Sequence, residues 1–218
     1  MKKRICTLLL ALCLTLGLLP AAAQAAGDGS GTFDTVRWTL DADGGLTVSG
    51  TGDLTDGAFA GRTDIVTVTF TGQVARIGRS AFAGCTQLRR VDGFGAVTCV
   101  MSRAFAGCTA LTELAVPGTV AEIGTGAFSA CTGLTAVTLA PGVRSLGAYA
   151  FAACTALRRI DLPDGMTLLG SGLFSGCTAL TELPLPDDVA WVEPRLCENC
   201  TALQNICLLY TSPSPRDA

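Results

Sequence analysis

The sequence predicts a solenoid with parallel strands on a concave face, short helical turns on a convex face and a β-hairpin cap at its N-terminal end. The first observation behind this expectation is a step of 23 residues at which side chains recur. The second is that one such unit is too small to bury its own apolar side, so that neighbouring units must stack. The third is an Asp-Gly turn between two alternating segments ahead of the first unit.

Several columns of side chains share this step and stay in register. The phenylalanine column consists of Phe59, Phe82, Phe105, Phe128, Phe151 and Phe174, with Cys197 at the next step. The cysteine column consists of Cys85, Cys108, Cys131, Cys154, Cys177 and Cys200. Aliphatic columns follow, beginning at Ile65, Val68, Val74 and Ile77. Together these columns predict one continuous apolar core across residues 53–206, in seven units.

Each unit divides into a strand side and a turn side. Between Leu111 and Pro117 apolar residues alternate with others and end at proline, which is typical of a short strand. Further along, Phe128 and Cys131 stand three apart, as on one face of a helical turn. Glycines precede this segment in four units, where we expect backbone angles that other residues resist, and they are Gly78, Gly124, Gly147 and Gly170.

The N-terminal part contains two segments ahead of the repeats. Residues 1–25 resemble a secretory signal peptide: basic residues precede a short apolar run, and Ala23-Gln24-Ala25 offers a cleavage pattern. The apolar run is too short for a membrane span, so we expect no transmembrane segment. Residues 26–52 are expected to form the cap, as a hairpin that turns at Asp43-Gly44 and covers the edge of the first coil.

The tail from 207 to 218 is expected to leave the repeat pattern, which stops after Ile206. Its string Leu-Tyr-Thr-Ser-Pro-Ser-Pro-Arg-Asp resembles a translated sequencing adapter, which implies that the segment is not native and that the gene continues. The alternative is a linker rich in serine and proline.

The repeated pattern Ile-Gly-x-x-Ala-Phe-x-x-Cys-x-x-Leu-x-x-Val-x-Leu-Pro resembles the BspA-like leucine-rich repeat of bacterial surface proteins. The resemblance runs from Gly57 to Ile206 and implies a leucine-rich-repeat solenoid of α/β type. It also implies a secreted or surface-exposed protein that functions in adhesion and in host or matrix contact. Three places depart from the pattern: Arg62 replaces cysteine, Cys197 replaces phenylalanine, and Val100-Met101 replaces Ile-Gly.

The composition argues against several classes of function. The chain has no histidine, so Ser-His-Asp and Cys-His nucleophiles and histidine metal ligands are excluded. We therefore expect no enzyme activity, no metal and no cofactor. Lys2 and Lys3 are the only lysines and would leave with the signal peptide, so the mature surface offers no basic patch for nucleic acid.

The cysteines are expected to remain free thiols. Six of them form one column and should point alike into the core, rather than at one another as a disulfide requires. Cys197 and Cys200 form a C-x-x-C pair, which suggests redox or metal chemistry only weakly without a second pair; the simpler interpretation is an irregular last coil.

The candidate contact surface is the outward side of the strands, the usual binding face of such solenoids. Its residues are Thr67, Arg90, Asp92, Glu113, Thr138, Arg159, Asp161 and Glu182. Strands about 4.8 Å apart would let Arg90 pair with Glu113 and Arg159 with Glu182. The simpler alternative is that these are solvated surface pairs, because the outward columns contain no aromatic anchor.

The sequence thus predicts a non-catalytic extracellular module that binds a protein or glycan ligand, secreted or held at the cell surface and monomeric as a full-length chain. The alternative is a structural spacer that presents a further C-terminal domain. An enzyme within these residues is disfavoured, since no nucleophile and base are in reach of one another.

Overall fold

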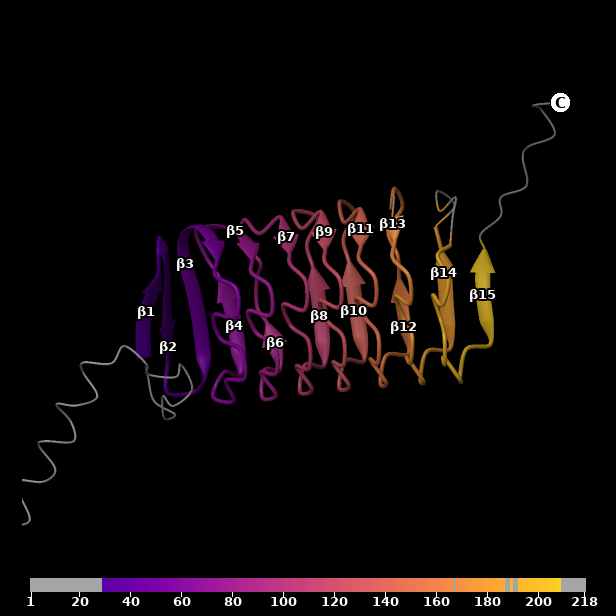
Figure 1. The fold of residues 1–218 in the computed structure, drawn as a ribbon, viewed down its shortest axis with the longest axis horizontal. Coiled ribbons are helices and arrows are strands. Elements are labelled where there is room, and N and C mark those ends of the chain that lie inside the picture. Colours follow the sequence, from indigo (N-terminus) through magenta and orange to yellow (C-terminus); the bar gives the residue numbers. More distant parts are fainter. Residues whose placement is uncertain (1–28, 167, 187–188, 190–191, 209–218) are drawn as a thin grey trace, which may run out of the picture.

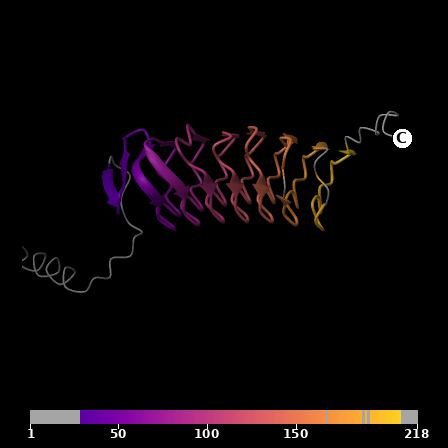
Figure 2. The same cartoon turned by 90° about the horizontal axis from the view of Figure 1, so that it is seen from above.

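The computed structural model describes residues 29–166, 168–186, 189 and 192–208. The signal peptide expected at residues 1–25 lies outside the described residues, as does the tail from 209 onward. The coils follow one another along a nearly straight axis from the cap to β15 (Figures 1 and 2).

Three antiparallel strands form the N-terminal end: β1 (Gly29–Phe33), β2 (Val36–Leu40) and β3 (Gly45–Leu54). The turn between β2 and β3 is closed by Asp41, whose carboxylate accepts hydrogen bonds from the backbone N–H groups of Asp43 and Gly45. β3 is long enough to pair in parallel with β4 (Thr67–Phe70) and, further on, with β5 (Gln73–Ile77). One strand therefore joins the hairpin to two parallel ladders of the solenoid, one that begins at β4 and one that begins at β5.

The hairpin also covers the apolar edge of the first coil. Phe33 and Trp38 both meet the Phe59 ring edge-on, with centroids 5.5 and 5.6 Å away. Arg62, which replaces cysteine in this coil, lies over the Trp38 ring and donates hydrogen bonds to the Asp64 carboxylate. The departure at Arg62 thus matches its place next to the hairpin, where a planar cation can cover an aromatic ring.

The strand face is made by one strand from each coil. Besides β4 it contains β6 (Arg90–Val91), β8 (Glu113–Val116), β10 (Ala136–Leu139), β12 (Arg159–Asp161), β14 (Glu182–Leu185) and β15 (Asn205–Leu208). Paired strands are parallel and stand one repeat apart, as in Ala136 with Arg159. Parallel strands at the fixed step are the arrangement that the sequence predicted.

A second ladder, which the sequence analysis did not predict, runs beside the first (Figure 1). It continues from β5 through β7 (Cys99–Val100), β9 (Glu122–Ile123), β11 (Ser145–Leu146) and β13 (Leu168–Leu169). The column that begins at Ile77 marks these strands, but most are only two residues long. Alternation cannot be recognised over two residues, so the pattern gave no strand signal there.

The third side, here called the turn face, contains no helix among the described residues, so the predicted helical turns and the α/β description are wrong. It consists of turns at 56–61, 79–84, 102–107, 125–130, 148–153, 171–176 and 194–199. Alternate N–H groups donate within the turn and to the next coil, as Ala104 does to Met101 and Phe105 to Ala127. A helix would need every N–H for its own i−4 carbonyl. The demand for hydrogen bonds between coils prevents it.

The glycines of the Ile-Gly positions serve another purpose than predicted. None of the four has a positive φ angle; instead a Cβ there would meet the backbone of the preceding coil. At Gly147 the added carbon would lie 2.6 Å from the Thr125 nitrogen, and at Gly170 it would lie 2.2 Å from the Ala148 nitrogen. Positive φ angles occur within the turns, for example at Arg103 and Ala130.

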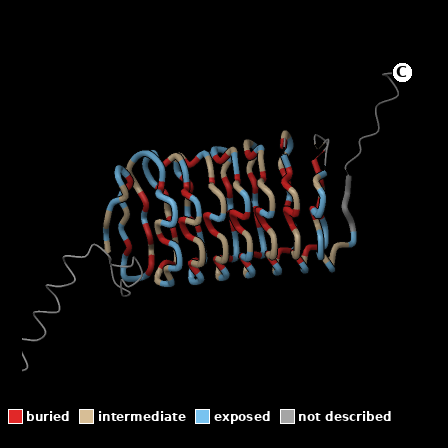
Figure 3. Tube along the Cα trace, in the orientation of Figure 1, coloured by how far each residue is buried: buried red, intermediate tan, exposed pale blue. Residues whose placement is uncertain are grey.

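The core lies between the three sides and repeats in every coil (Figure 3). Phenylalanine rings stack along the axis, with centroids 5.0 Å apart for Phe82 and Phe105 and 5.2 Å apart for Phe105 and Phe128. The cysteines of the column point inward as predicted, and those from Cys85 to Cys177 are fully buried. The column cysteines from Cys85 to Cys200 are free thiols, as are Cys99 and Cys197.

The repeat continues slightly past the predicted end. β15 runs to Leu208 and pairs with β14 in the usual step, Leu185 with Leu208. Leu208 also follows Leu185 by 23 residues, so the expectation that nothing after Ile206 continues a column is wrong for this residue. Strand pairing therefore includes the first two residues of the expected tail.

Candidate functional site

The eight residues predicted as contacts all lie on the strand face or directly after one of its strands. Seven of them are exposed and Thr67 is half-buried. Each directly precedes or follows a buried residue of the same coil, and Thr138 lies between two of them, Val137 and Leu139. The alternation of the strands therefore places them together along one surface, although it does not by itself give them a ligand.

The charged residues of this surface form two groups. Arg159 donates hydrogen bonds to Asp161 on its own strand and to Glu182 on the next strand, both at 2.9 Å. The two carboxylates, Asp161 foremost, raise the pKa of the Arg159 guanidinium. This pairing of Arg159 with Glu182 is the one expected from the sequence.

The other expected pair does not form, because Arg90 pairs with Asp92, two residues away on the same coil, at 3.0 Å. The reason lies in the sheet itself. β6 pairs with β4, and β8 pairs with β10, but β6 and β8 make no ladder in the described structure. Without that ladder Glu113 is not held opposite Arg90.

The break between β6 and β8 has a local cause. Gly93 and Gly95 have φ angles of 150° and 52°, and at the position of Gly93 the neighbouring coils carry Phe70 and Val116. The chain bends between the glycines and turns Phe94 into the core, where its ring stacks on Phe70 with centroids 6.4 Å apart. Strand geometry ends there because glycine adopts these angles and side-chain-bearing residues resist them.

A hollow of about 600 Å³ opens over this break. Its wall is largely apolar, and it includes the expected contacts Asp92 and Thr138 together with Phe94, Ala115 and Pro117. The hollow was not among the features predicted from the sequence, although a signal was present: Asp92-Gly93-Phe94-Gly95 departs from the strand pattern that ends at proline. The hollow and the exposed charges beside it form the candidate functional site.

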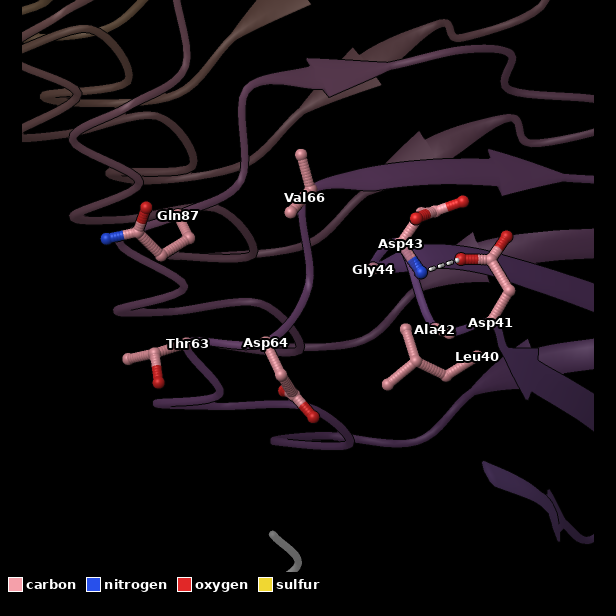
Figure 4. A pocket seen from close by; sticks show the side chains of 9 residues that line it. All are labelled: Leu40, Asp41, Ala42, Asp43, Gly44, Thr63, Asp64, Val66 and Gln87. Atoms are coloured by element: carbon pink, nitrogen blue, oxygen red, sulfur yellow. Dashed lines mark hydrogen bonds between the residues drawn. The ribbon is translucent and has the colours of Figure 1, made fainter. Parts of the chain in front are cut away.

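A second hollow, of about 510 Å³, lies where the hairpin turn meets the first coils (Figure 4). Asp41 and Asp43 line it from the hairpin turn, and Asp64, Val66 and Gln87 line it from the coils. Two of its carboxylates are already engaged, Asp41 with backbone N–H groups and Asp64 with Arg62. Because these two carboxylates already accept hydrogen bonds within the protein, they are less available to bind a ligand.

The described residues contain no cluster of three or more His, Cys, Asp or Glu side chains that would hold a metal ion. That part of the chain also contains no apolar helix of membrane-spanning length.

Two parallel ladders, a stacked phenylalanine column and an exposed strand face define a leucine-rich-repeat solenoid. The profile of the BspA type leucine rich repeat region matches residues 52–145 and 98–212, with six copies. The chain belongs to this family, as the residue pattern indicated.

Solved structures of bacterial leucine-rich-repeat proteins resemble the chain. The leucine rich repeat protein of T. pallidum is 25% identical, with a TM-score of 0.48, and the match covers 70% of this chain and 91% of that one. A leucine rich cell surface protein from Faecalibacterium prausnitzii is 15% identical, with a TM-score of 0.32 and coverage of 81% and 87%. The pneumococcal vaccine antigen PcpA is 17% identical, with a TM-score of 0.47 and coverage of 72% and 50%. No curated protein matches the sequence.

Proposed function

We propose that this chain is a non-catalytic extracellular binding module whose strand face contacts a protein or glycan ligand at the bacterial surface. The observation that carries the proposal is the hollow at the break between β6 and β8. Binding energy concentrates where a ligand group fills an apolar depression with polar groups around it. On this face the hollow supplies the depression, and Arg90 with Asp92 supplies the charged rim.

The remaining predicted contacts extend this surface along the axis. Glu113, Arg159, Asp161 and Glu182 lie on β8, β12 and β14 of the same strand face. Their charges are of both signs, which favours a ligand with mixed polar groups over a uniformly charged polymer. The family and the signal-like segment at 1–25 support export to the surface.

The proposal is tested with an array of glycans and immobilised extracellular-matrix proteins as probes. Thr138→Arg places a long charged side chain at the edge of the hollow and should weaken binding at least tenfold. Thr132→Arg is the matched control, because it adds the same charge to an exposed position of the same unit but away from the strand face. Equal loss of binding in both variants would refute a role for the hollow.

The alternative function, a spacer that holds another domain away from the cell, is favoured by the nearly straight stack of coils (Figure 2). A spacer needs length and stiffness but no specific surface. If neither the wild-type chain nor its variants bind any probe, the spacer is the better description.

A further inference from the structure

The turn at 194–199 and the residue after it differ in chemistry from every turn before them. In the five coils directly before it a buried phenylalanine and a buried cysteine stand three residues apart, as Phe174 and Cys177 do, and in the first coil Phe59 precedes Arg62. In this coil both positions hold cysteine, Cys197 in the phenylalanine column and Cys200 in the cysteine column. Both thiols pack against the edge of the core, so the two columns bring two sulfur atoms to one side of a single turn.

The backbone of this turn holds the two cysteines close together. The N–H of Cys200 donates to the carbonyl oxygen of Cys197 at 3.2 Å, which closes a four-residue turn. The ends of such a turn lie within about 7 Å of each other at Cα. Disulfides span Cα separations of about 4.4 to 6.8 Å. A bond between the two sulfurs thus requires a side-chain rotation rather than a change of fold.

The surroundings of the pair also differ from those of the other thiols. Cys197 and Cys200 are half-buried, whereas Cys85, Cys108 and Cys131 are fully buried. The Cys200 thiol donates to the Phe174 carbonyl oxygen at 3.1 Å, as the other column cysteines do to their own partners. Unlike them it also interacts with a second thiol, that of Cys197, and this interaction lowers the pKa of Cys200 to about 7 and raises the pKa of Cys197. A thiolate is the reactive form of cysteine, so Cys200 is set up as the nucleophile and Cys197 as the second thiol.

Cys99 shows that partial exposure alone does not produce this reactivity. It is half-buried as well, but burial and the nearby Glu122 carboxylate raise the pKa of its thiol. The thiol of Cys99 lies 3.6 Å from the Met101 sulfur and 3.9 Å from a Glu122 carboxylate oxygen. It therefore provides a comparison within the same chain.

We propose that Cys197 and Cys200 form a thiol–disulfide exchange site, which reacts with a small-molecule or protein disulfide and closes into a reversible disulfide within one turn. The Cys200 thiolate attacks one sulfur of the partner disulfide, and the first partner thiolate leaves. Cys197 then loses its proton and attacks the Cys200 sulfur, which expels the second partner thiol. Two electrons pass to the partner disulfide, whose sulfurs leave as two thiols, and the protein gains one sulfur–sulfur bond.

The test uses the folded 218-residue chain and glutathione disulfide as the probe. After incubation at neutral pH, acid quenching and peptide mass mapping, we expect a disulfide-linked Cys197–Cys200 peptide, while Cys85 to Cys177 remain reduced. In the reduced chain, iodoacetamide should label Cys200 roughly tenfold faster than Cys99 near pH 7, since its larger thiolate fraction outweighs its lower intrinsic nucleophilicity.

Two variants and one control separate the steps. Cys197→Ser should stop at a mixed disulfide between Cys200 and glutathione, because the second thiol is gone. Cys200→Ser should form no bond in this turn. Cys99→Ser, the matched control, should close as the wild-type chain does. The proposal fails if oxidised wild-type chain contains no Cys197–Cys200 peptide, or if Cys200 is labelled no faster than Cys99.

Discussion

The thiol of Cys131 donates a hydrogen bond to the backbone carbonyl oxygen of Phe105, in the preceding coil, at 3.2 Å. The same contact recurs from Cys108 to Phe82 and from Cys154 to Phe128. Each column cysteine therefore fills a small apolar space and also links its turn to the turn before it. A residue of similar size without a weak donor would fill the space but lose the link.

The buried thiols should resist chemical labelling until the chain unfolds. Burial raises the pKa of Cys131 to about 12, so thiolate is scarce near neutral pH and reagents cannot reach the sulfur. With iodoacetamide at pH 7 we expect Cys131 and Cys154 to react only in denaturant, as followed by peptide mass mapping. Rapid labelling of either residue in the native chain would show that their coils open.

The stacked rings should account for much of the stability. Phe128 is fully buried, with its ring between those of Phe105 and Phe151 at 5.2 and 5.5 Å. Phe128→Ala should lower the free energy of unfolding by about 3 to 5 kcal/mol, as measured by urea denaturation. Thr138→Ala on the exposed strand face is the control and should change it by less than about 0.5 kcal/mol. Equal effects would contradict the assignment of inside and outside.

Replacing Ala130 on the turn face by glycine should stabilise the chain. Ala130 is exposed and has a φ angle of 57°, which is costly for a residue with a Cβ. Ala130→Gly should therefore raise the melting temperature, by an amount that corresponds to about 1 kcal/mol or less. Ala152→Gly, at a turn position without a positive φ angle, should lower it.

The reverse substitution, from glycine to alanine, should destabilise the chain at Gly147, directly before the turn at 148–153. A Cβ at Gly147 would approach backbone atoms of Gly124 and Thr125 in the preceding coil, which cannot move aside as a flexible side chain can. Gly147→Ala should force adjacent coils apart and cost about 1 to 3 kcal/mol of unfolding free energy. Loss of hydrogen-exchange protection at the N–H of Gly147, which bonds the Ile123 carbonyl, would locate the damage.

The pair of Arg62 and Asp64 should make the N-terminal end sensitive to acid. The hydrogen bond from Arg62 lowers the pKa of the Asp64 carboxyl. A carboxyl whose pKa is lower in the folded state contributes stability above its unfolded-state pKa, about 3.9, and loses it as the pH falls through its folded-state pKa. Asp64→Asn should therefore destabilise the chain at pH 7, by about 1 kcal/mol after allowance for solvent screening.

The difference between this variant and the wild-type chain should shrink steadily below about pH 4. Asp161→Asn serves as the control, since its carboxylate is exposed on the strand face. It should change the free energy of unfolding little, both at pH 7 and below about pH 4. A difference for Asp64→Asn that stays constant down to low pH would rule out the ion pair as its cause.

The sequence predicted the core and the strand face because both depend on side chains that recur at one step. Phe128, Cys131 and Leu134 each have a counterpart in the next coil, and all are buried. The turn face was predicted wrongly because a spacing of three between Phe128 and Cys131 fits a helical turn as well as a tighter turn. Hydrogen bonds to the next coil decide between them, and no local pattern records such bonds.

Only part of the candidate site could be predicted from the sequence: the outward residues of the strands were predicted, and the hollow was not. Outward positions such as Arg159 and Glu182 follow from alternation, and their pairing follows from strand spacing. The hollow instead depends on a lost ladder between β6 and β8, which two glycines cause. The departure from the repeat at Gly93 therefore carried more information about a site than the repeat itself.

Beyond β3, the parallel ladders place each paired residue opposite the residue 23 positions away, from Thr67 with Arg90 to Glu182 with Asn205. Such a chain tolerates changes of length in whole units only. Removing one complete repeat from the middle would rejoin Phe to Phe and Cys to Cys and shorten the rod without exposing its interior. Removing a single residue from a strand would turn every later inward side chain of that strand outward. Tandem duplication of an entire repeat is thus the least disruptive way for this protein to become longer.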